Sequence, residues 1–207
     1  MDHVYLLNDR LKFVVYFYDI SVLPFREIMR KIEAYEPPYE CPPDYIDDAP
    51  PFLEEHMDAH RAINFIGITS VGMIVSLLKT FLDEFREYHW SNELKKGIPG
   101  WYGKYKDFFD DDDYRWELSG ADLGFIQQMI LLRNDDQHAR PLFTEYLQQG
   151  DHHRNEFPDS AFLDGHMRDL GIMEVTRENL LRGQEEVRKL CTFLQETCDR
   201  LFYARAR

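Results

Sequence analysis

Apolar and polar residues alternate along most of the chain with the three- and four-residue spacing of helices. Over residues 52–92 this spacing predicts one long helix, because positions three and four apart share one face. The predicted face carries Ile63, Ile66, Ser70, Met73, Leu77 and Phe81. Gly67 and Gly72 lie inside this helix, and a helix keeps glycine most easily where another backbone packs close.

The same helix contains seventeen consecutive uncharged residues, 62–78. A membrane span usually needs about 20 predominantly apolar residues, and this run includes Asn64, Thr69, Ser70 and Ser76. We therefore expect a buried central helix rather than a membrane span.

The N-terminal part, residues 3–35, predicts one or two helices with a break near Pro24. Proline inside a helix removes a backbone hydrogen bond and clashes with the preceding turn. Residues 14–22 (VVYFYDISV) are rich in β-branched and aromatic side chains, so a strand is the alternative for that stretch.

Two more helices are predicted toward the C-terminus. Ser119 and Asp122 resemble a capping box that opens the first, and Pro141 disfavours helix at Arg140, so this helix should end near His138. Thr176 should cap the second. Its apolar stripe is Leu180, Leu181, Val187, Leu190, Leu194, Cys198 and Leu201.

Residues 36–51 form a predicted linker, because six of the ten prolines lie between Pro37 and Pro51. The linker separates an expected N-terminal helical hairpin, residues 1–35, from a main helical body, residues 52–207. With few convincing strands, the chain predicts a single all-α domain: an up-and-down helical bundle with an N-terminal helical extension.

The net charge of the chain limits the partners that it can bind. The chain has 24 Lys and Arg against 38 Asp and Glu, a formal net charge of -14. This balance excludes a protein that coats nucleic acid through a uniformly basic surface. Eight acidic residues without any Lys or Arg lie in residues 36–58, and five more lie in 107–113, so a local phosphate site remains compatible with the rest of the chain.

Three cysteines, Cys41, Cys191 and Cys198, form no CxxC pair. An odd number without such a pair argues against a disulfide framework or a zinc ribbon, and no Cys–His dyad signal is evident. The N-terminus lacks the basic region of a secretory signal. We expect a reduced, cytoplasmic location.

The sharpest chemical signal is the segment RNDDQH, residues 133–138. In a continuous helix Asn134 and His138 are four residues apart and share a face, while the long side chain of Arg133 can swing toward them. A histidine can transfer a proton, and an arginine can hold phosphate oxygens with two parallel hydrogen bonds.

This motif and the order of the predicted elements resemble the HEPN superfamily, over roughly residues 52–207. The matching order is a long central helix, a breaker-rich loop (GWYGKYKDFF), a helix that ends in RNDDQH, and a closing amphipathic helix. Many HEPN proteins are endoribonucleases that need no metal or other cofactor and work as homodimers with a composite active site.

The resemblance implies that His138 is the general acid/base, that Arg133 stabilises the charged phosphorane, and that Asn134 positions the phosphate or His138. RNA cleavage would proceed by attack of the 2′-hydroxyl and leave 2′,3′-cyclic phosphate and 5′-hydroxyl ends. Such a nuclease could be a toxin or a phage-defence component, with an antitoxin partner such as a nucleotidyltransferase.

Other readings of the same residues stay open. Arg133 and His138 can simply be favourable cations at a helix C-terminus, and some HEPN proteins are catalytically silent dimeric binding modules. A weak RNA-contacting set is the basic residues Arg140, Arg182, Arg188 and Lys189, of which the last three can instead pair with Glu178, Glu185 and Glu186.

A metal-binding helical bundle is the third possible class. His56 and His60 lie four residues apart and could hold a metal ion, but neither an HExxH motif nor paired Glu-x-x-His motifs accompany them. The run Asp110–Asp113 lacks the glycine and glutamate spacing of an EF-hand and predicts a solvated acidic loop.

Overall fold

The computed structural model describes residues 3–41, 49–110, 113–137, 160–162 and 174–205. It is built from helices α1 (His3–Glu33), α2 (Leu53–His89), α3 (Trp101–Phe108), α4 (Leu123–Gln137) and α6 (Arg177–Arg205), with a short 3₁₀ helix η1 (Trp116–Ser119). No strand occurs in these ranges. The expected all-α architecture is therefore confirmed.

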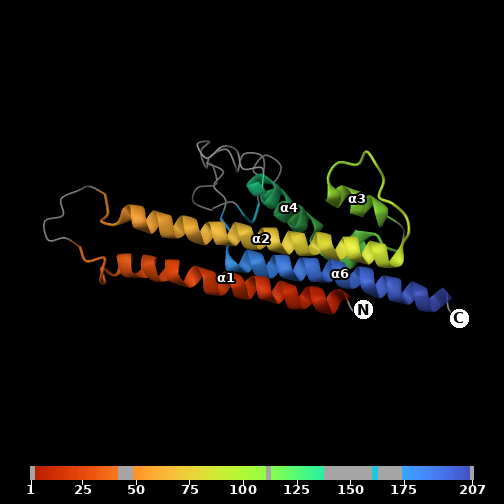
Figure 1. The fold of residues 1–207 in the computed structure, drawn as a ribbon, viewed down its shortest axis with the longest axis horizontal. Coiled ribbons are helices and arrows are strands. Elements are labelled where there is room, and N and C mark those ends of the chain that lie inside the picture. The colour runs from red at the N-terminus through yellow and green to blue at the C-terminus, as the bar shows by residue number, and fades with distance from the viewer. Residues whose placement is uncertain (1–2, 42–48, 111–112, 138–159, 163–173, 206–207) are drawn as a thin grey trace.

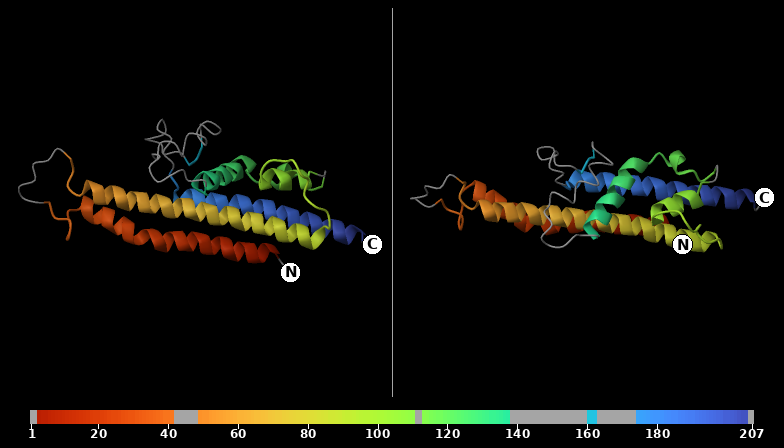
Figure 2. Two further views of the ribbon diagram at one scale, coloured as in Figure 1. Left: turned by 45° about the horizontal axis from the view of Figure 1, so that its top comes forward. Right: turned by 90° about the horizontal axis from the view of Figure 1, so that it is seen from above.

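Three long helices, α1, α2 and α6, lie side by side along the molecule (Figure 1). α1 runs antiparallel to α2 and α6, and α4 crosses over α2 and α6 at an angle (Figure 2). Their shared core includes Leu11, Val75, Ile126 and Leu190, none of which exposes more than a trace of surface. The part of the chain that contains α3 and η1 packs over the C-terminal end of α2 (Figure 1).

The central position of α2 explains its composition. It contacts α1, α3, α4 and α6, and it is long and apolar enough to cross a membrane by length and composition alone, a test that the core helix of a soluble protein also passes. The predicted face was only partly right: Ser70 and Phe81 are buried, but most of the fully buried positions belong to neighbouring faces. The buried set includes Val71, Ile74, Val75, Leu78, Leu82 and Phe85.

The expected N-terminal hairpin is wrong, because residues 3–33 form one continuous helix with Pro24 inside it. Neither the break near Pro24 nor the alternative strand at residues 14–22 is present. Pro24 and Ile20 are exposed, so the carbonyl that loses its helical donor at the proline faces water, while the opposite face of α1 packs along α2 and α6. Packing thus outweighs the local cost of the proline.

The two capping predictions had different outcomes. Thr176 caps α6 as expected: its Oγ1 accepts a hydrogen bond from Asn179 N at 3.2 Å, and Asn179 Oδ1 accepts one from Thr176 N at 2.9 Å. Ser119 does not open α4. The cap there is Asp122, whose Oδ1 accepts a hydrogen bond from Phe125 N at 2.9 Å, while Ser119 Oγ is bonded to the backbone of η1 and Ala121.

Leu181, expected on the buried stripe of α6, is 39% exposed. The neighbouring positions Leu180, Val187, Leu190, Leu194 and Cys198 are buried as predicted, and Leu201 is partly buried. The stripe that faces α2 and α4 is therefore narrower at its N-terminal end than the sequence pattern suggests.

Candidate functional site

A groove of about 490 Å³ lies where α1, α2 and the end of α4 meet. Most of its lining residues come from α2, three come from α1, and Arg133 comes from α4. The lining residues are Arg10, Phe13, Val14, Thr69, Gly72, Met73, Ser76, Leu77, Thr80 and Arg133.

Arg133 reaches this groove because α4 crosses α2 at a glycine. A Cβ added at Gly72 would lie 3.8 Å from Arg133 Cγ, so the aliphatic stem of the arginine rests directly on α2. Arg133 is half-buried, and its Nε is fully buried without a hydrogen-bond partner in the described part of the chain. A buried guanidinium nitrogen without a partner is costly. An anion in the groove would stabilise the positive charge of this side chain.

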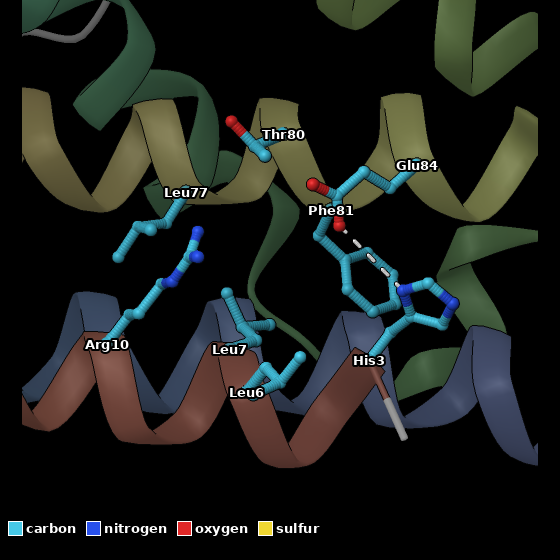
Figure 3. A pocket seen from close by; sticks show the side chains of 8 residues that line it. All are labelled: His3, Leu6, Leu7, Arg10, Leu77, Thr80, Phe81 and Glu84. Carbon is cyan, nitrogen blue, oxygen red and sulfur yellow. Dashed lines mark ion pairs between the residues drawn. The ribbon is translucent and has the colours of Figure 1, made fainter. Parts of the chain in front are cut away.

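Arg10 extends the groove toward the N-terminus of α1. It also borders a smaller pocket of about 40 Å³, in which His3 Nδ1 lies 3.8 Å from Glu84 Oε2. Figure 3 shows Arg10 rising from α1 toward Leu77 on α2, with the His3–Glu84 pair farther along the same channel. The carboxylate of Glu84 therefore lies beyond the groove, on the far side of Arg10 and Thr80.

The charge of the groove is opposite to that of the whole protein. Arg10 and Arg133 are its charged lining residues, and no Asp or Glu is among the described residues that line it. Thr69, Ser76 and Thr80 add hydroxyl groups, of which Ser76 Oγ donates to Gly72 O at 2.8 Å. The lining thus combines two cations, hydroxyls and the Phe13 ring, which suits a phosphate group attached to an apolar or aromatic moiety.

The acidic segments join the bundle at other places. Residues 34–41, which follow α1, and residues 49–52, which precede α2, lie at one end of the bundle (Figure 1). About 24 Å of helix separates Leu53 from Thr69, the first groove residue of α2. This exceeds the Debye length at physiological salt, so the acids among these residues barely weaken the positive potential at the groove.

The proposed catalytic motif is only partly within the described residues. Arg133 and Asn134 lie in the last turns of α4, and Asn134 is half-buried beside the groove lining rather than part of it. His138 and Arg140 lie outside the described residues. The structure therefore places Arg133 in a groove and leaves its distance to His138 untested.

The three basic residues expected on the last helix are paired within the protein. Arg182 Nη2 lies 2.6 Å from Asp122 Oδ2, and its guanidinium stacks 4.2 Å above the Phe125 ring. Arg188 pairs with Glu185 at 2.6 Å and Lys189 with Glu186 at 2.9 Å. These pairs make the structural role the simpler account of all three, although for Arg182 the partner is Asp122 and not Glu178.

His56 and His60 have different neighbours. His56 Nε2 is 3.2 Å from Glu33 Oε1 on α1, whereas His60 borders a separate pocket with Arg26 and Thr176. No group of three metal-ligating side chains occurs among the residues that the structure describes. The observed contacts of His56 thus tie α2 to the end of α1.

One pair that the sequence did not reveal is Cys198 and His89. Cys198 Sγ lies 3.2 Å from His89 Nδ1, although 109 residues separate them in the chain. Burial is the main cause that raises the pKa of the Cys198 thiol and the main cause that lowers the pKa of His89. Both shifts favour the neutral thiol and neutral imidazole, whereas a reactive cysteine needs a thiolate.

No family model, curated protein or solved structure matches the chain. The resemblance to the HEPN superfamily therefore stays a prediction from the motif and the order of elements.

Proposed function

We propose that this protein is a metal-independent endoribonuclease of the HEPN type, with its active site at the end of α4. The observation that carries the proposal is the groove around Arg133, whose described charged lining is two arginines in a protein with a net charge of -14. The RNDDQH motif supplies the chemistry, because its arginine borders that groove.

In the proposed reaction His138 removes the proton of a ribose 2′-hydroxyl, and the 2′-oxygen attacks the adjacent phosphorus. The bond from phosphorus to the 5′-oxygen breaks, and that oxygen takes a proton from a histidine. Arg133 donates hydrogen bonds to the non-bridging oxygens as negative charge develops on the phosphorane. Asn134 positions His138 or the phosphate.

The remaining groove residues fit RNA binding outside the reacting phosphate. Arg10, on α1, lines the same groove as Arg133 and offers a second cation for a neighbouring phosphate. Phe13, which is 57% exposed, offers a ring face on which a base can stack. Arg140 remains a secondary candidate for a contact with longer RNA. Arg182, Arg188 and Lys189 would have to exchange their carboxylate partners for phosphate to make such contacts.

The biological setting follows from the same resemblance. A cytoplasmic ribonuclease of this kind would act as a toxin or phage-defence component, held inactive by an antitoxin such as a nucleotidyltransferase. Its free cysteines agree with a reducing compartment.

The test is cleavage of labelled RNA by purified protein in excess EDTA. We expect 2′,3′-cyclic phosphate and 5′-hydroxyl ends, and no cleavage at a site whose 2′-hydroxyl has been replaced by hydrogen. His138→Ala and Arg133→Ala should each lower the rate by about 10²–10⁴. Arg133→Lys should restore little, because lysine lacks the planar fork of donors.

Arg61→Ala is the matched control, because Arg61 is exposed on α2 and pairs with Asp58, away from the groove. It should retain full activity. RNA binding without cleavage would instead establish the catalytically silent binding module, and activity abolished by EDTA would point to a metal enzyme. Either result would overturn the proposed reaction.

A further inference from the structure

A separate pocket of about 250 Å³ lies where the C-terminal ends of α2 and α6 meet the chain between α3 and η1 (Figure 1). It shares no lining residue with the groove around Arg133. Its volume is just below the usual range for drug-sized ligands, so it suits a small ligand or a single head group. The lining residues are His89, Trp90, Asp113, Tyr114, Cys198, Leu201 and Phe202.

Aromatic rings make up most of this lining. The ring centroids of Trp90 and Tyr114 are 5.5 Å apart and their planes meet at 79°, so the two rings stand as adjoining walls. His89 adds a third ring, 5.6 Å from that of Trp90 and inclined to it by 67°. Phe202, on α6, is 70% exposed and completes the lining near the surface. The faces of such rings carry partial negative charge and attract cations.

Contacts behind the lining hold these rings in place. The Tyr114 hydroxyl donates a hydrogen bond to the Cys198 sulfur, and that sulfur lies 3.2 Å from His89 Nδ1. Trp90 packs against Phe109 with the two ring centroids 5.5 Å apart. A pocket whose walls are fixed beforehand loses little conformational entropy when a ligand enters. The Cys198–His89 contact therefore serves to position the rings rather than to activate a thiol.

The charges at this pocket are the opposite of those in the groove. Asp113, the last residue of the acidic run 110–113, lines the pocket, and no Lys or Arg is among its described lining residues. The negative charge of Asp199 opposes proton loss from both Cys198 and His89, so a second carboxylate acts at the same place. Burial holds the pKa of His89 below its ordinary value, so the imidazole is neutral at pH 7. A cation entering the pocket thus meets acidic and aromatic groups.

We propose that this pocket binds an organic cation through a trimethylammonium group, as found in choline or in a trimethyllysine side chain. The rings of Trp90, Tyr114 and Phe202 contact the methyl groups, and Asp113 supplies the opposite charge. A trimethylammonium group has no N–H to satisfy and is weakly hydrated, whereas the ammonium of lysine is strongly hydrated, so an aromatic lining favours the methylated cation. The cation–π contacts within the described chain involve other rings than Trp90. This binding does not depend on the proposed ribonuclease reaction.

Calorimetric titration of the full-length protein with choline tests the proposal. The control ligand is the neutral carbon isostere of choline, in which a tert-butyl group replaces the trimethylammonium group. We expect choline to bind at least about tenfold more tightly than the isostere, because only the cation is attracted by ring faces and by Asp113. Equal affinities, or no binding of choline, would overturn the proposal.

A second pair of ligands distinguishes the two sources of the group. These are a short peptide with one trimethyllysine and the same peptide with unmodified lysine. Tighter binding of the methylated peptide than of choline would identify a modified protein as the source, and weaker binding would identify a small molecule. Equal binding of the methylated and unmodified peptides would overturn the preference for a trimethylammonium group.

Two variants test the residues. Phe202→Leu keeps an apolar side chain but removes an exposed ring, so it should weaken choline binding by about three- to tenfold. Asp113→Asn should also weaken it, most strongly at low salt. The matched control is Phe65→Leu, at a 65% exposed ring on α2 about 36 Å along the helix from His89, and it should bind choline normally. Unchanged binding by Phe202→Leu would contradict the assigned lining.

Ring-fluorinated tryptophan tests the cation–π contact without removing a side chain. Fluorine withdraws electron density from the face of the indole, and Trp90 is the one tryptophan of the three that lines this pocket. Protein made with this amino acid should bind choline more weakly and the neutral isostere equally well. Equal weakening for both ligands, or for neither, would show that attraction to the Trp90 ring does not hold the cation.

Discussion

Two stretches of the α2 surface differ in how the rest of the chain covers them. Toward its C-terminus, aromatic rings enclose α2: Phe85 packs against Trp90 and Phe109, and Trp116 packs against Tyr102 and Phe109. Trp116 is 1% exposed there. Between Thr69 and Thr80, one side of the same helix is left as an open groove that Arg10 and Arg133 also line.

The difference separates residues that stabilise the fold from residues available for chemistry. At the aromatic end the rings fill the space, and burial raises the pKa of Tyr105 to about 12, with a hydrogen bond to Asp83 adding to the shift. Buried polar atoms without partners in the described chain occur at both places, Tyr102 Oη and Trp116 Nε1 at the aromatic end and Arg133 Nε at the groove. What distinguishes Arg133 is that it carries a positive charge and lines an open groove, where an anion would stabilise that charge.

The largest loss of stability should follow from removing a buried ring at the C-terminal, aromatic end of α2. Trp116→Ala removes a fully buried indole and should lower the free energy of unfolding by about 3–5 kcal/mol. Urea unfolding measures it, with Leu118→Ala, an exposed neighbour on η1, as a control that should change stability by less than about 0.5 kcal/mol. A loss below about 1 kcal/mol for Trp116→Ala would mean that this end is loosely packed.

The two glycines inside α2 should respond in opposite directions. A Cβ at Gly67 would lie 2.7 Å from Val175 Cβ and 3.0 Å from Val175 O, so Gly67→Ala forces two backbones apart and should cost about 1–3 kcal/mol. Gly72→Ala meets only the flexible Arg133 stem at 3.8 Å and should gain up to about 1 kcal/mol from helix propensity. Unfolding midpoints of the two variants, measured side by side, would contradict this account if they shift equally.

Arg133→Met should separate function from stability. Methionine keeps an aliphatic stem over Gly72 and removes the buried, unpartnered Nε, so the free energy of unfolding should stay within about 0.5 kcal/mol of the original or rise. RNA cleavage should be lost. Destabilisation by more than about 1 kcal/mol would show that the guanidinium is structural and that the groove argument is wrong.

The smallest expected effect is on the pH dependence of stability, and it arises from His89, which contacts Cys198. Burial lowers the pKa of His89 below its ordinary value of 6.5, so the unfolded chain binds this proton more readily than the folded one. Stability should therefore fall as the pH drops below about 6.5, down to the folded-state pKa. His89→Gln should lose less stability than the original protein between pH 7 and pH 5.5 in urea titrations. An unchanged pH dependence would show that other groups carry it.

The helices were predictable where local signals and packing agree. The existence and extent of α2 and the Thr176 cap of α6 were predicted correctly, because both depend on residues close in sequence. The buried face of α2 was predicted only in part, because its neighbours decide which side is covered. The break at Pro24 was wrong, because contacts of α1 with α2 and α6 hold the helix through it. The Ser119 start was wrong because η1 uses that serine, and Asp122 provides the cap.

The site was predictable only as a motif. Arg133 could be singled out from RNDDQH, but its neighbours in space, Arg10 and Gly72, come from helices 123 and 61 residues earlier in the chain. The Cys198–His89 contact was missed for the same reason, since no local spacing connects residues 109 positions apart.

By itself, then, the sequence determined the all-helical class, the central place of residues 53–89 and the concentration of acid outside the RNDDQH region, because periodicity, proline and charge act locally. Only the tertiary structure decided that Arg133 packs on Gly72 of α2 and lines one groove together with Arg10. It also decided that Arg182, Arg188 and Lys189 pair with nearby carboxylates. Finally, it left one apolar face of α1 exposed among the described residues. Those outcomes depend on the angle at which α4 crosses α2 and on which faces of three long helices meet. Such long-range packing is a property of the assembled bundle rather than of any one segment.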